Sequence, residues 1–506
     1  MWRLLMLATI ASATLSGVDG HPVSVEVHVA DGLPGFSIVG LPDASCREAR
    51  DRVRAAIVSS GATWPLKRIT VNLAPGGVPK VGAGLDLPIA LGVLTASGQL
   101  PVIEDGFSAF GELGLDGSVR SIPGAVSLAD VATGRWVLVP APDAAVAGFV
   151  AGDRVRAVRG LGDVTAALVD GSPWPDPDPP GADLASVVVP DLGDVRGQPV
   201  ARTALEYAAA GGHHLLLVGP PGAGKTMLAR RLPGLLPALA PDEALEVTRV
   251  HSASGLALPP GGLVERPPFR APHHSASMAA LVGGGSGHAR PGEVSRASCG
   301  VLFLDELGEF APSVLDALRQ PLEEGVVRVA RAHATSEQPA RVLLVAAMNP
   351  CPCGMGGDTA CRCPAAARAR YARRVSGPLL DRLDLMVQVG RPAAADVLGP
   401  PAESTAAVAA RVAEVRSMAA ERGVRCNAAL DGPALDRHAP LEPAARAILE
   451  HALQVGQVSG RGLRRIRCVA RTIRDLDDAG PSLRATDVHA AISLRARPVL
   501  GGRHAV

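Results

Sequence analysis

Regular alternation of apolar and polar residues characterises the first part of this chain. The segment "VSVEVHV" at 23–29 changes character at every position, which predicts a half-buried strand, and "RITVNLAP" at 68–75 predicts a second strand. Between them, apolar residues recur at helical spacing, with Asp43 placed to cap the start of a helix and Gly61 placed to end it. This mixture predicts an α/β domain over residues 1–168.

The opening segment, "MWRLLMLATIASATLSG", allows two interpretations. Arg3, the apolar run and the Ala-Ser-Ala sequence are features of a secretory signal peptide, whereas the same apolar run also suits a first β-strand. We favour the strand because the apolar run is short. No other stretch approaches the roughly 20 apolar residues of a membrane span, so we expect a soluble, cytoplasmic protein without a membrane partner.

The pattern changes twice along the rest of the chain. Residues 169–189 are rich in Pro and Asp, cannot build a core, and are typical of a linker. From 190 to 395, apolar strands, a glycine loop and helices follow one another, which predicts a parallel sheet covered on both faces. Residues 396–506 contain helices with Ser or Thr starts and Gly ends, which predicts a small helical domain.

Composition and charge narrow the class only a little. A chain of 506 residues exceeds the size of one ordinary core, which favours several domains. The net charge of +1 excludes a generally basic surface but leaves room for a local arginine-lined channel that binds phosphates. Lysine occurs only at Lys67, Lys80 and Lys225, so each marks a position where Arg is a poor substitute.

Lys225 lies in a phosphate-binding loop. The segment "GPPGAGKT" follows the apolar run "HHLLLVG" and precedes a helix, which is the context that a P-loop requires. Backbone N–H groups of such a loop surround the phosphates, the lysine reaches the β- and γ-phosphates, and the final Thr ligates Mg²⁺. The expected ATP-binding residues of this loop are Gly219, Pro220, Pro221, Gly222, Ala223, Gly224, Lys225 and Thr226.

A second phosphate-site motif follows later in the chain. "VLFLDE" at 301–306 is a buried strand that ends in two carboxylates. Asp305 would hold Mg²⁺ and Glu306 would polarise the attacking water, which predicts hydrolysis of ATP.

Together with "MNP" at 348–350, "LLDRLD" at 379–384 and "SGRGLRRIRCVARTIRDL" at 459–476, these motifs resemble AAA+ ATPases of the magnesium-chelatase-like group. Within that group, "GLPGFSIVGLPDASCREARDRVRAAI", "RITVNLAPGG", "LDLPIALGVL" and "FRAPHHSAS" resemble the ComM (YifB) family. The resemblance implies a homo-hexameric ATP-dependent DNA helicase or branch-migration motor. Such a motor acts on DNA, with recombination proteins, during natural transformation.

The same resemblance implies roles for three further residues. Asn349 in "MNP" matches the sensor that positions the hydrolytic water. Arg382 matches the arginine finger that enters the neighbouring subunit's site, although a surface salt bridge to Asp381 or Asp384 is the alternative. Arg461 matches the second sensor.

Two assignments in the same group are less specific. Arg464 or Arg465 could take the second-sensor role, and the arginines of 461–474 could face phosphates or form a solvated helix face. The segment "DVRGQ" at 194–198 matches the one beside the adenine.

The N-terminal domain resembles the Lon-type protease fold but departs from it at the catalytic dyad. No lysine follows Lys80 in this domain, and a serine such as Ser118 without an activating base is a weak nucleophile. We therefore expect contacts with DNA or other subunits rather than proteolysis.

Two clusters could bind metal. The adjacent histidines of "PHHSAS" at 272–277 diverge on any regular element, so we favour a loop at the pore or subunit interface over a metal pair. Cys351, Cys353, Cys361 and Cys363 form C-x-C-x₇-C-x-C, an insertion at 351–363 that suits a structural Zn²⁺ site, with an Fe–S cluster and a disulfide pair as alternatives.

Two other functions use the same ATPase core. A chelatase-like motor would remodel a metal-insertion partner, and a nucleotide-gated scaffold would bind peptides without moving DNA. A chelatase motor would not need the long N-terminal domain, and the sequence shows no integrin-like metal-binding segment to act as its partner. The scaffold would use the Lon-like domain as its peptide binder, and ATP turnover that is indifferent to DNA would favour it.

Overall fold

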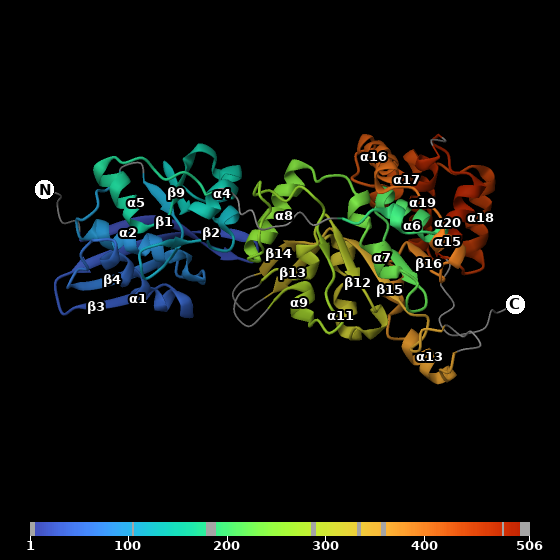
Figure 1. Cartoon of the computed structure of the whole chain (residues 1–506), viewed down its shortest axis with the longest axis horizontal. Helices are drawn as coiled ribbons and strands as arrows, with labels where there is room; N and C mark the ends of the chain where they lie inside the picture. The colour runs from blue at the N-terminus through green and yellow to red at the C-terminus, as the bar shows by residue number, and fades with distance from the viewer. Residues whose placement is uncertain are drawn as a thin grey trace.

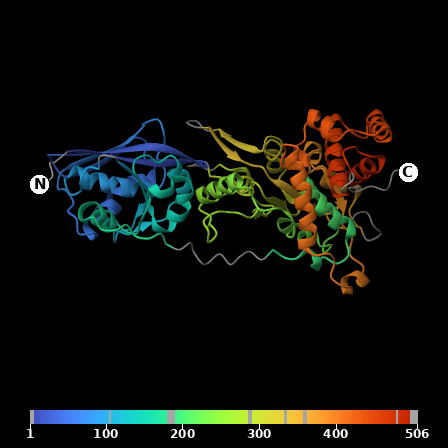
Figure 2. The same cartoon turned by 90° about the horizontal axis from the view of Figure 1, so that it is seen from above.

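The computed structural model describes residues 6–103, 106–178, 189–284, 290–330, 335–355, 361–477 and 480–495. The molecule is elongated, with the N-terminal α/β unit at one end, a second sheet in the middle and the C-terminal helices at the other end (Figures 1 and 2). None of the helices in these ranges is long and apolar enough to cross a membrane. The mixed α/β fold with a helical C-terminal region agrees with the fold class predicted from the sequence.

The N-terminal unit is built on a seven-stranded sheet with the order β3-β4-β2-β1-β5-β8-β9. Its strands are β1 (Leu7–Ser16), β2 (Asp19–Ala30), β3 (Gly35–Val39), β4 (Arg68–Ala74), β5 (Phe107–Ala109), β8 (Trp136–Pro140) and β9 (Val155–Val158), with β6 (Glu112–Leu113) and β7 (Val119–Arg120) in a separate hairpin. Its helices are α1 (Ala44–Ser59), α2 (Asp86–Ala96), α3 (Ala125–Asp130), α4 (Ala144–Ala151) and α5 (Leu161–Thr165).

The local sequence signals of this unit are confirmed. The Asp43 carboxylate accepts the backbone N–H of Cys46 at 2.8 Å and caps α1, as the sequence predicts. Residues 7–16 form β1, which pairs with β2 and β5 inside the sheet, so the strand interpretation of this apolar run is confirmed.

The central sheet has the order β11-β12-β15-β10-β16, and all of its neighbouring strands run parallel. The strands are β10 (Leu215–Val218), β11 (Phe269–Arg270), β12 (Val301–Leu304), β15 (Leu343–Met348) and β16 (Leu385–Gln388), with β13 (Val326–Ala330) and β14 (Thr335–Pro339) in a hairpin beside them. Helices around the sheet are α6 (Pro199–Gly211), α7 (Lys225–Ala229), α8 (Pro241–Ala253), α9 (Met278–Val282), α10 (Glu293–Arg296), α11 (Pro312–Ala317), α12 (Pro321–Glu324), α13 (Ala365–Ala372), α14 (Gly377–Leu380) and α15 (Ala394–Leu398).

The remaining helices form the C-terminal bundle. They are α16 (Thr405–Glu421), α17 (Gly432–His438), α18 (Pro443–Gln454), α19 (Gly460–Leu476) and α20 (Ala485–Arg495). α19 is the centre of the bundle, because it packs against α16, α18, α20 and also α6 of the sheet region.

The sequence led us to expect that the arginines of α19 face either phosphates or solvent. In the structure they do not share one environment. Arg471 and Arg474 are buried, and Arg471 donates to the Asp475 carboxylate and to the backbone carbonyl of Pro481. Arg467 pairs with Asp436 at 2.9 Å. These guanidinium groups hold the bundle together because a buried charge needs partners. Arg461 and Arg464, near the start of the helix, are exposed instead.

The bundle joins the sheet beside two adjacent histidines, of which His213 is buried and His214 is half-buried. The Nε2 atom of His213 lies 2.8 Å from the Thr472 hydroxyl of α19, and the Nδ1 atom of His214 accepts the backbone N–H of Leu344. Burial lowers the pKa of each histidine from 6.5 to about 4, although the nearby Asp384 carboxylate opposes this shift. Both rings are therefore neutral in the folded protein at neutral pH.

This pair predicts acid lability of the joint. The unfolded chain binds protons at these histidines near pH 6.5, whereas the folded chain resists them until about pH 4. The contribution of these neutral histidines to the free energy of unfolding is therefore fully present above pH 6.5. It falls as the pH drops from 6.5 to about 4, by up to about 1.4 kcal/mol per histidine for each pH unit. Thermal unfolding at several pH values should show this fall. His213→Gln should make this fall less steep, because only His214 then contributes, and the exposed control His28→Gln should not change it.

Candidate nucleotide-binding site

The sequence-predicted phosphate motifs meet at one edge of the central sheet. The P-loop follows β10, Asp305 follows β12, and Asn349 follows β15, which lies between those two strands. Because the strands are parallel, their carboxyl ends share one edge, where open α/β sheets bind their ligands. Residues separated by more than one hundred positions are thereby brought together.

Lys225 lies inside its own loop. Its Nζ atom donates to the Gly219 carbonyl at 2.6 Å, to the Pro220 carbonyl at 3.0 Å and to Asn349 Oδ1 at 3.2 Å. Burial lowers the lysine pKa, while the Asp305 and Glu306 carboxylates oppose that change. Lys225 therefore joins the P-loop to the strand that carries the predicted sensor Asn349.

The predicted Mg²⁺ ligands are in direct contact. The Thr226 hydroxyl donates to Asp305 Oδ2 at 2.7 Å, at the start of α7. A hydroxyl and a carboxylate are the oxygen ligands that Mg²⁺ prefers, so the side chains present fit this ion.

Glu306 lies next to Asp305 but takes no part in the Thr226–Asp305 hydrogen bond. Its backbone has φ +52°, a left-handed conformation that is uncommon for residues other than glycine, and its side chain is 55% exposed. Its Oε2 atom lies 3.1 Å from Nδ1 of His274. The carboxylate is thus accessible to water and held by one ring.

The contact with His274 was not foreseen from the sequence. His274 comes soon after β11, the strand beside β12, and this neighbouring position is the only sequence signal that could have indicated it. The adjacent His273 turns to the Ser275 hydroxyl at 2.8 Å. The two histidines therefore have different partners, and the loop role at a pore or interface stays a prediction.

The segment 194–198 lies against the P-loop, since Gln198 Nε2 donates to the Ala223 carbonyl at 3.4 Å. Its predicted place beside the adenine stays a prediction.

Arg382 lies at the opposite edge of the sheet. It comes just before β16, which is parallel to β10, and Asp384 N donates to the carbonyl of His214 just before β10. The length of the four-residue strand, about 13 Å, separates this edge from the chain's own P-loop.

One carboxylate at that edge forms ion pairs with both Arg382, the predicted finger, and Arg461, the predicted second sensor. Glu323 of α12 lies 2.6 Å from Nη2 of Arg382 and 3.0 Å from Nη1 of Arg461. Arg382 is buried and also donates to the carbonyls of Arg319 and Pro378. Arg465 instead pairs with Asp384 at 2.6 Å. The roles of Arg382 as finger and Arg461 as second sensor stay predictions, but their positions are adjacent.

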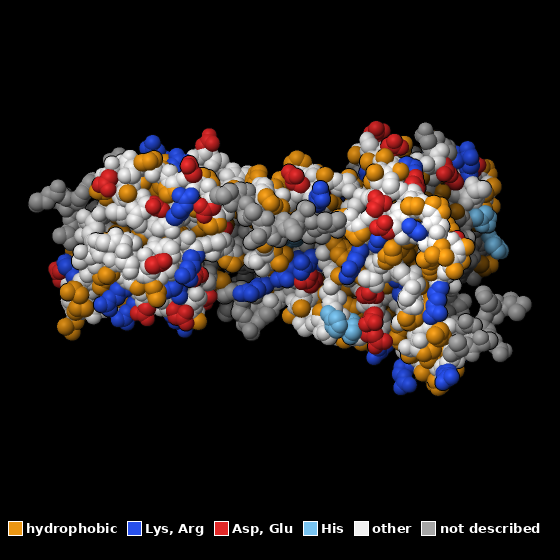
Figure 3. Space-filling view, in the orientation of Figure 1, with side chains coloured by type: hydrophobic (Ala, Val, Ile, Leu, Met, Phe, Trp, Pro, Cys, Tyr) orange, Lys and Arg blue, Asp and Glu red, His pale blue; other side chains and the backbone are white. Residues whose placement is uncertain are grey.

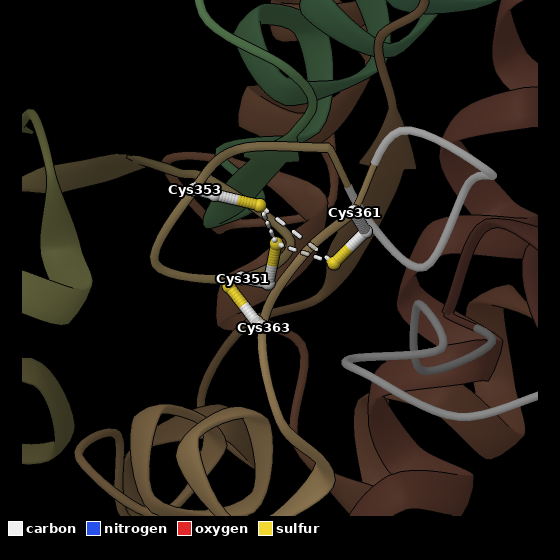
Figure 4. A group of neighbouring side chains, drawn as sticks. All are labelled: Cys351, Cys353, Cys361 and Cys363. Atoms are coloured by element: carbon white, nitrogen blue, oxygen red, sulfur yellow. Dashed lines mark hydrogen bonds between the residues drawn. The ribbon is translucent and has the colours of Figure 1, made fainter.

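The four clustered cysteines converge, as Figure 4 shows. Their sulfur atoms all lie within 4.8 Å of one another, and Cys351 Sγ is 3.4 Å from that of Cys353 and 3.7 Å from that of Cys361. Four thiolates around a tetrahedral Zn²⁺ at about 2.3 Å would lie about 3.8 Å apart. The side chains present therefore fit a tetrahedral metal ion.

The N-terminal unit shows no paired nucleophile at the residues considered from the sequence. Lys80 is buried and donates to the Pro75 carbonyl, whereas the Ser118 hydroxyl donates to Asp116 at 2.6 Å. Lys80 and Ser118 therefore have separate partners, and the lack of a Ser-Lys dyad in this domain stays a prediction.

Basic and acidic side chains are interspersed over most of the face in Figure 3, and a group of Lys and Arg side chains lies near its middle. On this face the basic surface is therefore local, as the net charge of +1 leads one to expect.

The P-loop, the acidic strand end and the intervening asparagine strand, on a parallel sheet with a helical bundle behind it, place the chain among the AAA+ proteins. Three segments match families. Residues 191–397 match the family described as "Magnesium chelatase, subunit ChlI", residues 25–142 "Subunit ChlI of Mg-chelatase", and residues 402–495 "Magnesium chelatase, subunit ChlI C-terminal".

Similar full-length proteins agree with these matches. An uncharacterised protein of Mycobacterium tuberculosis is 47% identical over 501 residues, which cover 97% of this chain and 99% of that protein. The uncharacterised protein YifB of Escherichia coli is 43% identical over 484 residues, 94% of each chain. The competence protein ComM of Haemophilus influenzae is 42% identical over 489 residues, 93% of this chain and 94% of that protein. The chain belongs to the ComM/YifB family of magnesium-chelatase-like AAA+ proteins, a membership that implies use of a nucleotide and Mg²⁺.

Proposed function

We propose that this protein is a hexameric, ATP-hydrolysing DNA motor that promotes branch migration during recombination of DNA in natural transformation. It would act in the cytoplasm with recombination proteins as partners. The observation that carries the proposal is the separation of two charge sets. The phosphate-binding residues lie at one edge of the central sheet and the paired arginines at the other.

The first set supports hydrolysis. Lys225 would leave its loop carbonyls for the β- and γ-phosphates, and Thr226 and Asp305 would hold Mg²⁺, which neutralises phosphate charge when bound. Glu306 would accept the proton of the attacking water, while Asn349 would orient that water.

The second set supports a ring. Arg382 and Arg461 are far from their own P-loop, so they would complete the site of a neighbouring subunit and stabilise charge on the transferring phosphate there. A closed head-to-tail ring gives every site such a neighbour, and the family resemblance implies six subunits.

The DNA substrate is supported by a relative. The similar Haemophilus influenzae protein carries the name competence protein, and the resemblance found in the sequence points to the same process.

DNA-stimulated turnover tests this function. We expect four-way and forked DNA to raise ATP hydrolysis by the full-length protein several-fold, and light scattering to show a hexamer with ATP. Turnover that ignores DNA but rises with a metal-insertion partner would favour the chelatase-like motor, which the family descriptions keep as the second candidate. Turnover that ignores both would favour a nucleotide-gated scaffold.

We also propose that the four clustered cysteines hold a structural Zn²⁺. The supporting observation is the set of sulfur separations, which suits a tetrahedral thiolate site. Metal analysis of protein purified without oxygen tests the identity of the ion, and iron with sulfide would indicate a cluster instead.

The role of Glu323 in orienting Arg382 and Arg461 can be tested by substitution. Glu323→Gln removes the charge that orients both guanidinium groups, so ATP turnover should fall about tenfold, with little change in nucleotide affinity. The control is Glu324→Gln on the same helix, whose partner is Arg328, and it should keep normal turnover. Equal turnover of the two variants would show that Glu323 does not orient the arginines.

A further inference from the structure

The first pair of clustered cysteines lies directly on the P-loop. Cys351 and Cys353 follow Asn349, and Gly354 closes their turn by donating its N–H to the Cys351 carbonyl at 2.9 Å. Gly354 has φ +83°, and a Cβ atom at this residue would lie 2.4 Å from Cδ of Pro221. Only glycine allows this close approach, so the cysteine turn is packed against the loop that binds phosphates.

The second pair of cysteines leads to the turn after β12 that carries Asp305 and Glu306, which we call the Walker B turn. Cys361 and Cys363 precede α13, whose Tyr371 ring packs on Gly308, where a Cβ atom would lie 2.5 Å from Cζ of the ring. Arg374 donates to the Gly308 carbonyl at 2.8 Å. Gly308 follows Asp305 and Glu306 by a few residues, so this second arm contacts the turn that carries the acidic pair.

The two arms also meet at the sensor. Tyr371 of the second arm is buried, which raises its pKa, and the backbone of Asn349, the first residue of the other arm, lies close enough to oppose this rise. The first arm, residues 349–354, therefore contacts the P-loop. The second arm, residues 361–374, contacts the Walker B turn, and the two arms lie side by side at Asn349.

The thiols lie where the arms come together. Each arm supplies two of the four sulfur atoms, which all lie within 4.8 Å of one another, and Figure 4 shows those of Cys351, Cys353 and Cys361 facing one another. Four neighbouring thiolates repel one another, whereas a bound divalent cation joins them into one closed site. The ion would thus cross-link the two arms.

We propose that metal bound by these cysteines braces the nucleotide site, so that its occupancy sets how tightly the chain holds ATP and ADP. This inference rests on the proposed nucleotide site and assigns the metal a controlling role there. Loss of the ion frees the turn at Gly354 from the α13 arm, and the P-loop and Walker B turn lose a shared support.

The test compares nucleotide affinity with metal content in the full-length protein. Protein purified without oxygen is divided into untreated, chelator-stripped and Zn²⁺-reconstituted samples, and each is titrated with a fluorescent ADP analogue. We expect one metal per chain, a Kd about tenfold higher after stripping, and recovery with Zn²⁺. Thermal unfolding checks that the stripped protein remains folded.

Two variants separate the metal from the packing. Cys361→Ser should lose metal and bind nucleotide weakly, whereas the control Cys426→Ser, in the helical bundle, should change neither. Gly354→Ala keeps all four thiols but forces the turn away from Pro221, so it should keep metal and still bind nucleotide weakly. Its control is Gly423→Ala, which has the same left-handed strain (φ +75°) with no atom near the new Cβ.

The outcomes are decisive for the brace. An unchanged Kd after stripping, or normal nucleotide affinity in Gly354→Ala, would overturn it, as would protein that neither contains nor takes up Zn²⁺. If the DNA-motor proposal is wrong but the brace is right, the protein will bind nucleotide in a metal-dependent way and will not remodel DNA. The two proposals can therefore fail separately.

Discussion

Glu306→Gln is expected to reduce ATP hydrolysis by about 10²- to 10⁴-fold while ATP binding remains. The amide cannot accept a proton from the attacking water, yet it preserves the size of the side chain and leaves Lys225, Thr226 and Asp305 unchanged. Steady-state hydrolysis and titration with a fluorescent nucleotide measure the two effects separately.

The matched control is Glu337→Gln on the β13–β14 hairpin, an exposed carboxylate that pairs with Arg328. It should hydrolyse ATP normally. Normal hydrolysis by Glu306→Gln, or loss of nucleotide binding in that variant, would show that Glu306 is not the group that activates water.

Arg382→Ala should reduce hydrolysis by about 10³-fold, because the family resemblance and the position at the far sheet edge make it a finger for the neighbouring site. Mixing reveals the direction of supply. In a mixed ring, an Arg382→Ala subunit with intact Glu306 can receive Arg382 from a Glu306→Gln neighbour. Two nearly inactive proteins should therefore regain activity when they are mixed.

Recovery of activity on mixing would exclude the alternative that Arg382 acts in the site of its own subunit. If Arg382 served its own subunit, every site of the mixed ring would lack either Glu306 or Arg382, and activity would stay at the level of the separate variants. Normal ATP hydrolysis by the Arg382→Ala variant on its own would show that Arg382 has no role in hydrolysis.

Much of the phosphate site could be predicted because its signals are local. The order of strand, glycine loop, Lys-Thr and helix occupies a short stretch, and the acidic strand end has its own apolar run. The Asp43 cap of α1 and the parallel central sheet were predicted for the same reason, since caps and apolar runs act over a few residues.

The partners of these groups could not be predicted because they come from distant segments. His274 meets Glu306 only through the pairing of β11 with β12, and Glu323 meets Arg382 and Arg461 only when α12 and α19 pack at the same edge. The arginines of α19 show the same limit. Helical spacing gives their periodicity but not the Asp and carbonyl groups that bury Arg471 and Arg474.

The cysteine spacing was predictive of four converging thiols, and the sulfur separations agree with that prediction. Its position relative to the nucleotide site was only partly visible in the sequence. The cysteines begin two residues after Asn349, but the contact between Gly354 and Pro221 depends on how β15 and β10 pair.

Branch migration on a synthetic four-way DNA junction tests the central claim most directly. The full-length protein with ATP and Mg²⁺ should convert the junction to separated duplexes, and Glu306→Gln or a non-hydrolysable ATP analogue should abolish this conversion. A wild-type protein that hydrolyses ATP at an unchanged rate with DNA present, and leaves the junction intact, would contradict the account.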